Sequence, residues 1–154
     1  MPFSYRKGLL FNKPIMQYPG YILSNHLPAV KAIHAFTEEL INYLFPVTDD
    51  PEMFLEHHES ELYKLTEHFA ALLNSVDTPG KLDKESISSK FFASLGSVKD
   101  LLIKDAQLIL DFDPAASSFE EVILTYPGFY AILVHRLAHI MYLAKIPLIP
   151  RFMS

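Results

Sequence analysis

Apolar residues recur at steps of three and four along the stretch that begins at Pro51 and ends near Val76. Because an α-helix completes a turn every 3.6 residues, this spacing places them on one helical face. The face is formed by Leu55, His58, Leu62, Leu65, Phe69 and Leu72. A helix this long must bury its apolar face against other helices, so the pattern predicts an all-α protein.

Shorter patterns predict the remaining helices. We expect them at about 27–44, 86–95, 97–111 and 128–144, with a short helix capped by Ser117 or Ser118 and a last turn from Pro147. Gly96 should break the chain between the third and fourth helices, and residues 77–80 should form a turn. The inward residues of the first and fourth helices should be Val30, Ile33, Thr37, Leu40, Ile41, Leu44, Val98, Leu101, Leu102, Leu108 and Ile109. The fold class is therefore a multi-helix bundle of about five to seven helices, preceded by an irregular arm over residues 1–25.

Composition and charge exclude several classes of function. The chain of 154 residues carries a formal net charge of -5, which argues against nucleic acid as a partner. It contains no cysteine, so disulfides, thiolate zinc sites and a cysteine nucleophile are excluded, and the cytoplasm is the expected compartment. The most apolar stretch, 131–150, carries four basic or histidine side chains and Pro147, so no membrane span is expected.

Acidic residues concentrate in one segment. From Glu38 to Glu67 there are nine acidic side chains and one lysine, Lys64. His57, Glu61 and His68 lie in this segment, but adjacent helical positions point about 100° apart, so we expect a solvated acidic face and no convergence of these three.

A second pair of histidines, His135 and His139, has the i,i+4 spacing that can hold zinc. Arg136 stands where a metalloprotease helix carries its glutamate, and a cation beside a cation site is unfavourable. We interpret the pair as a packed polar edge of a nearly all-apolar helix.

Asp113 is the candidate ligand-binding residue. Pro114 disfavours helical backbone at Asp113, so the preceding helix should stop there and hold a carboxylate at a fixed place. Small Ala115 and Ala116 would let a cationic amine approach. A purely structural turn aspartate is the alternative. The other unusual carboxylate, Asp105, faces inward, where we expect it to bond to a helix cap.

The run from Asp113 to Ser154 resembles the N-terminal helical domain of serine O-acetyltransferases. The matching pieces are Asp113-Pro114-Ala115, Tyr126-Pro127-Gly128-Phe129, His135-Arg136-Leu137-Ala138-His139 and the step from Ile146 to Arg151. The resemblance implies transfer of an acetyl group from acetyl-CoA to L-serine, the first step of cysteine biosynthesis. It also implies that Asp113 contacts the amino group of serine, or of the inhibitor L-cysteine, with Pro114 and Ala115 lining the same pocket. The family's helical domains join two trimers, so a homo-oligomer is expected.

The sequence also departs from the family. The family's catalytic domain is a left-handed β-helix that holds the general base and the acetyl-CoA site, and these repeats are absent from this sequence. We therefore expect residues 26–146 to form the helical domain and 147–154 to begin a linker helix. We expect no catalytic residue, metal or cofactor in this chain, which alone should be inactive. A helical interaction module without catalysis and a small regulator that binds an amino acid are the alternatives.

Overall fold

The computed structural model describes residues 30–76 and 83–153. This part of the chain contains six α-helices and no strand: α1 Val30–Leu44, α2 Pro51–Asn74, α3 Lys84–Phe112, α4 Phe119–Thr125, α5 Pro127–Leu143 and α6 Ile149–Phe152. The all-α prediction is confirmed. The predicted arm over 1–25, the start of the first helix at 27 and the turn at 77–80 lie outside the described residues.

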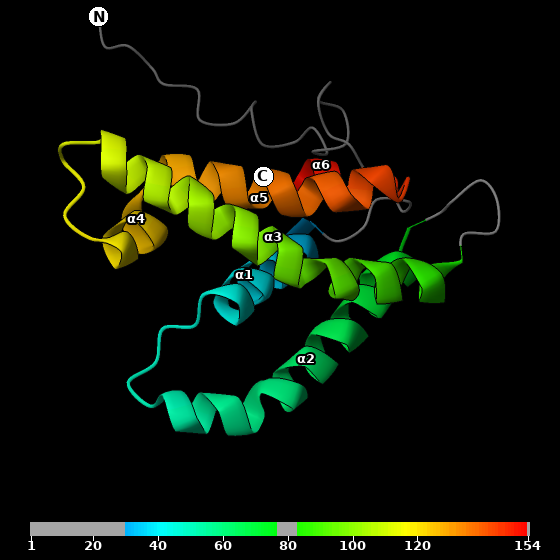
Figure 1. The fold of residues 1–154 in the computed structure, drawn as a ribbon. Coiled ribbons are helices and arrows are strands. Elements are labelled where there is room, and N and C mark those ends of the chain that lie inside the picture. Colours follow the sequence, from blue (N-terminus) through cyan, green and yellow to red (C-terminus); the bar gives the residue numbers. More distant parts are fainter. Residues whose placement is uncertain (1–29, 77–82, 154) are drawn as a thin grey trace, which may run out of the picture.

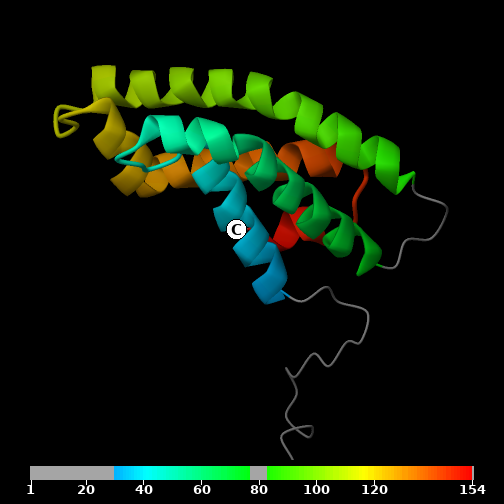
Figure 2. The same ribbon diagram turned by 90° about the horizontal axis from the view of Figure 1, so that it is seen from below.

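The two long helices α3 and α5 lie side by side, and α1 and α2 pack below them (Figure 1). The short helix α4 turns the chain at one end of this layer and contacts both α3 and α5. At the other end α6 packs against α1 and α5, as the view from below also shows (Figure 2). The loop between α3 and α4 is therefore presented at one extremity of the bundle.

Aromatic side chains form the centre of the contact between α1, α2 and α3. Phe36 of α1 stacks on Phe69 of α2, with ring centroids 5.4 Å apart. Phe69 also lies 4.6 Å from Phe91 and 5.8 Å from Phe92, both on α3. Phe69 is fully buried, and Phe36 and Phe91 are nearly so. This cluster joins three helices that are distant in sequence.

The predicted inward face of α2 is only half buried. Leu65, Phe69 and Leu72 are buried as expected, whereas Leu55 is 71 % exposed. The first turns of α2 extend away from the other described helices (Figure 1), and no described helix covers Leu55. Asp50 caps this end of the helix by accepting a hydrogen bond from the backbone N–H of Met53 at 3.0 Å.

The predicted break at Gly96 is wrong, because α3 runs uninterrupted from Lys84 to Phe112. A glycine inside a helix costs about 1 kcal/mol relative to alanine, which packing on both sides can offset. Leu95 and Val98 are buried beside it and supply that packing. On the same helix, Leu101 and Leu108 were expected to face inward but are 43 % and 55 % exposed.

The chain leaves α5 through two residues with positive φ. Lys145 has φ 58°, and the N–H groups of Lys145 and Ile146 bond to the carbonyls of Tyr142 and Met141. This is a Schellman closure with lysine at the position where glycine is usual. Leu148 has φ 64°, and α6 begins after it at Ile149, two residues later than predicted from Pro147.

Candidate functional site

Asp113 ends α3 as the sequence predicts. Its backbone is extended, with φ -96° and ψ 108°, while its N–H still bonds to the carbonyl of Ile109 at 2.9 Å. The following Pro114 excludes another helical residue here. Asp113 is therefore the C-cap of a 29-residue helix, and its position is set by that helix.

A local turn holds the Asp113 carboxylate. Its Oδ1 accepts a hydrogen bond from the N–H of Ala115 at 2.9 Å, and its carbonyl accepts one from the N–H of Ala116 at 3.1 Å. An aspartate bonded to the backbone two residues on is an Asx turn, which fixes the side-chain direction. Asp113 is partly exposed, and Pro114 and Ala115 are exposed. The carboxylate is thus accessible to a ligand and is not sealed in the core.

The chain re-enters a helix five residues beyond Pro114, at Phe119, through a cap that the sequence predicted. Ser118 is the N-cap of α4, and its Oγ accepts a hydrogen bond from the N–H of Glu121 at 3.1 Å. The Glu121 carboxylate accepts a hydrogen bond from the N–H of Ser117 at 2.8 Å, one residue before the position used in a capping box. The two caps hold the loop from Asp113 to Ser118 at both ends.

Tyr126, at the end of α4, is a member of this site that sequence reasoning did not identify. Its pKa is raised above 10.0 by partial burial and by the negative charges of Asp113 and Glu121, and hydrogen bonding to Asp113 raises it further. Sequence analysis places Tyr126 only in the matching piece Tyr126-Pro127-Gly128-Phe129, because no short-range pattern shows that the chain returns the phenol to Asp113. The Tyr126 phenol therefore lies close enough to the carboxylates of Asp113 and Glu121 for their charges to raise its pKa.

Burial raises the pKa of Tyr126 most, and the charge and hydrogen bond of Asp113 raise it further, so replacing Asp113 with Asn should lower that pKa part of the way toward 10. The folded protein favours the neutral Tyr126 phenol, so this group contributes to the free energy of unfolding. The contribution is complete below pH 10 and is lost as the pH rises through the higher pKa of the folded state. Absorbance at 295 nm, followed against pH with Tyr126→Phe to assign the signal, measures this. An unchanged Tyr126 titration in Asp113→Asn would show that the two groups do not interact.

Asp105 has a different partner from the one predicted. Both carboxylate oxygens bind Arg136 of α5, with Nε to Oδ2 at 2.6 Å and Nη2 to Oδ1 at 2.9 Å. The expected bond from Asp105 to a helix cap is therefore wrong. This ion pair also explains why an arginine stands between His135 and His139: its guanidinium binds Asp105 on α3. Its pKa is raised by the hydrogen bond to Asp105, so it remains charged.

The histidine pair on α5 forms an exposed edge. The rings of His135 and His139 stack with centroids 6.0 Å apart, and Tyr142 continues the row at 6.3 Å. Within residues 30–76 and 83–153, no three histidine, aspartate or glutamate side chains are grouped as a metal ion would require.

Among the described residues, His57, Glu61 and His68 do not converge on one another, as predicted, although they share a groove. They follow one face of α2 at i, i+4 and i+11, and all three line the same groove. The reason is that these spacings, unlike those of adjacent residues, return to the same side of a helix. Each has its own contact, however: His68 pairs with Glu39, Glu61 pairs with Lys64, and His57 Nδ1 lies 2.8 Å from the Met53 carbonyl.

The chain is similar to serine acetyltransferases. It is 47 % identical over 53 residues to a serine acetyltransferase of Synechococcus elongatus, which covers 34 % of this chain and 22 % of the relative. A serine acetyltransferase of Bacillus subtilis is 46 % identical over 54 residues, covering 35 % of this chain and 25 % of the relative. A plasmid-borne serine acetyltransferase of S. elongatus aligns over 155 residues at 29 % identity, covering 86 % of this chain and 49 % of the relative.

These matches confirm the resemblance to serine acetyltransferases. They support the prediction that the chain corresponds to the N-terminal portion of such proteins. No family model matches the chain. The chain spans about half of the longest-aligned relative and a smaller share of the others. Among the helices that the structure describes, none has the length and apolarity needed to cross a bilayer.

Proposed function

We propose that the chain is the N-terminal helical part of a serine O-acetyltransferase, and that Asp113 contributes to its L-serine pocket. The observation that carries the proposal is the accessible Asp113 carboxylate, held at the end of α3 by the Ala115 N–H. The likeness to serine acetyltransferases supplies the reaction, in which the acetyl group of acetyl-CoA is transferred to L-serine as cysteine biosynthesis begins.

The chemistry of the loop fits the amino group of an amino acid. A serine ammonium can donate a charge-assisted hydrogen bond to a carboxylate, which is stronger than a neutral one. Pro114 and Ala115 are exposed next to that carboxylate, and the small alanine leaves space for the ligand. L-Cysteine carries the same ammonium and would compete for the same contact.

The acetyl-CoA site and the general base belong, in this proposal, to the catalytic part of the whole enzyme. A general base must come within hydrogen-bond reach of the serine hydroxyl. His135 and His139 stack on each other along α5 and we assign neither to that role. Because acetyl-CoA is the co-substrate, we propose the cytoplasm as the compartment.

A chimera tests the serine contact. Residues 1–154 would replace the aligned half of the plasmid-borne serine acetyltransferase of S. elongatus, and release of CoA would be followed at varied serine and acetyl-CoA. Asp113→Asn should raise KM for serine about 10-fold to 100-fold, the range expected for a lost hydrogen bond to a charged group. KM for acetyl-CoA should stay unchanged.

Asp111→Asn is the matched control. Asp111 is exposed two residues earlier, and its carboxylate accepts a hydrogen bond from Gln107 at 2.7 Å. The same amide substitution there should leave both KM values unchanged. Equal effects at positions 111 and 113, or no effect at either, would contradict the assignment of Asp113.

We further propose that the chain forms a homo-oligomer through α3 and α4. Leu101, Leu108 and Phe112 lie at i, i+7 and i+11 along α3 and are 43 %, 55 % and 81 % exposed. Leu124 of α4 is also exposed. Sedimentation should show association that Leu108→Glu weakens, whereas a strict monomer over a wide concentration range would exclude it.

A further inference from the structure

A pocket lies where three helices meet, at the end of α1, the first half of α2 and the middle of α3. Its volume of about 460 Å³ is within the range of small-molecule sites. Apolar side chains from all three helices line it, among them Leu44 of α1, Leu62 of α2, and Phe92 and Leu95 of α3. The pocket can therefore hold the apolar body of a small ligand.

The charge of this pocket is opposite in sign to that of the chain. Its polar lining side chains are Tyr43, His58 and Lys99, and none of the described residues that line it is acidic, although the chain carries a net charge of -5. Glu59 and Asp100 follow His58 and Lys99 in the sequence but are exposed and do not line the pocket. Adjacent residues of a helix point about 100° apart, which separates each pair. The lining therefore favours an anion.

Within residues 30–76 and 83–153, Lys99 has an aromatic neighbour but no acidic partner. Its Nζ lies over the ring of Phe45, 5.7 Å from the centroid, and it makes no hydrogen bond or ion pair there. A cation–π contact leaves the three N–H donors of the ammonium available to an acceptor. Burial raises the pKa of Tyr43 above 10.0, so its phenol stays neutral and is a second donor in the pocket.

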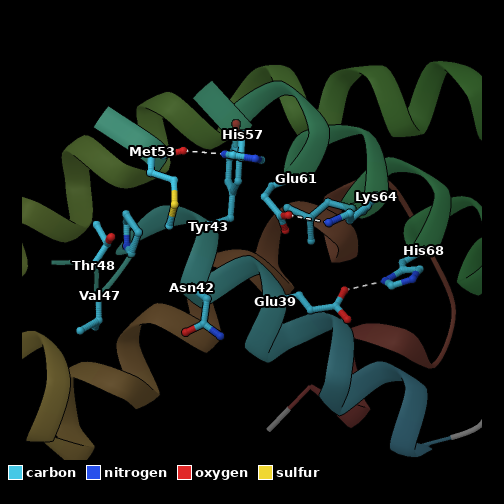
Figure 3. Close-up of a pocket in the computed structure, with 12 residues that line it drawn as sticks. Glu39, Asn42, Tyr43, Val47, Thr48, Met53, His57, Glu61, Lys64 and His68 are labelled. Carbon is cyan, nitrogen blue, oxygen red and sulfur yellow. Dashed lines mark hydrogen bonds and ion pairs between the residues drawn. The ribbon is translucent and has the colours of Figure 1, made fainter. Parts of the chain in front are cut away.

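The groove that runs along α1 and α2 differs in this respect (Figure 3). Its two acidic side chains are already paired, Glu39 with His68 and Glu61 with Lys64. A charged ligand there would have to compete with these pairs. The Lys99 ammonium has no such competitor among the described residues, so the pocket of α1, α2 and α3 is the better candidate for a charged ligand.

Gly96 keeps one wall of the pocket open. Glycine is unfavourable inside a helix, and Gly96 lies well within α3. A Cβ at this position would meet no atom within 4 Å, so close packing does not require glycine here. A larger side chain at position 96 would instead occupy part of the space that a ligand could use.

We propose that this pocket binds a small organic anion with an apolar body, whose carboxylate pairs with Lys99 and whose body lies on Leu44, Leu62 and Phe92. A carboxylate accepts charge-assisted hydrogen bonds from an ammonium, which are stronger than neutral ones. The pocket shares no residue with the loop at Asp113, so this binding is independent of the proposed acetyl transfer.

Three probes with the same apolar body test the charge preference: hexanoate, hexanol and hexylammonium. Hexanoate, titrated into the isotope-labelled full chain, should shift the amide signals of Leu62, Ala93 and Gly96 in a saturable way. Hexanol should bind about 10-fold more weakly, the lower end of the range for a hydrogen bond to a charged group, because Lys99 is only partly buried. Hexylammonium should cause no saturable shift.

Two substitutions, each with a matched control, locate the binding. Lys99→Met keeps the apolar stem and should weaken hexanoate about 10-fold while leaving hexanol unchanged. Lys104→Met removes an exposed lysine of the same helix and should change neither. Gly96→Leu should abolish binding of both probes and raise the melting temperature, because leucine is the better helix former. Ser97→Leu adds the same side chain outside the pocket and should leave binding unchanged.

Four outcomes would overturn the proposal. Hexanoate could cause no saturable shift, or hexylammonium could bind as tightly as hexanoate, and either would mean that the pocket does not select an anion. Gly96→Leu could keep its affinity for hexanoate, which would place the probe elsewhere. Lys99→Met could lower the melting temperature without changing hexanoate binding, which would assign Lys99 to the C-terminal end of α1, where a cation is favourable.

Discussion

Replacing Phe69 with Ala should lower the free energy of unfolding by about 3–5 kcal/mol, the range for truncating a buried phenylalanine. The side chain has no exposed surface and contacts Phe36, Phe91 and Phe92. Because these rings come from α1 and α3, the cavity cannot close without moving two helices, so the cost should lie in the upper part of that range. Unfolding in guanidinium, followed by circular dichroism, measures it.

Leu55→Ala provides the comparison on the same helix. Leu55 belongs to the same predicted face of α2 but is 71 % exposed. Its truncation should change the stability by no more than about 0.5 kcal/mol, as at other surface positions. If Leu55→Ala cost as much as Phe69→Ala, the first turns of α2 would have to be covered in solution.

This pair also shows what sequence periodicity can predict. The spacing of apolar residues identified the buried face of α2 correctly from Leu65 onward, because periodicity depends only on the helix itself. It could not show where the neighbouring helices end. That limit explains why Leu55 is exposed. It also explains the exposure of Leu101 and Leu108 on α3, which have the helical period but no partner within the described residues.

The break predicted at Gly96 failed for a related reason. Glycine is a local signal worth about 1 kcal/mol, whereas the packing that overrides it involves residues distant in sequence. Phe91, which stacks on Phe69, and Leu102 are both buried on the same helix, on either side of Gly96. A single helix keeps both in the core.

Local chemistry made the loop at Asp113 more predictable than the rest of the site. Pro114 and Ser118 act on their immediate neighbours, so the end of α3 and the cap of α4 followed from the sequence. Two other contacts depend on how α4 and α5 return to α3. These are the approach of Tyr126 to Asp113 and the ion pair between Arg136 and Asp105. No short-range pattern specifies that return.

Replacing Asp105 with Asn should destabilise the fold by about 1–2 kcal/mol. Asn matches Asp in size and nearly in helix propensity, so the main loss is the charged, two-point contact with Arg136. A fully buried pair would cost about 3–5 kcal/mol when broken, but the Arg136 side chain is 31 % exposed and water can partly replace its partner. Glu61→Ala, which breaks the exposed pair with Lys64, should cost at most about 1 kcal/mol.

A double-mutant cycle separates the contact from the burial of each side chain. Arg136→Met keeps much of the apolar stem of Arg136 while removing its charge, and leaves Asp105 without its partner. The double variant Asp105→Asn with Arg136→Met should cost less than the two single changes together, because neither side chain is then a charge that has lost its partner. Additive losses would mean that the two side chains stabilise α3 and α5 separately. A large coupling would instead identify this pair as the polar link that fixes how α5 lies on α3, and with it where α4 and Tyr126 meet the Asp113 loop.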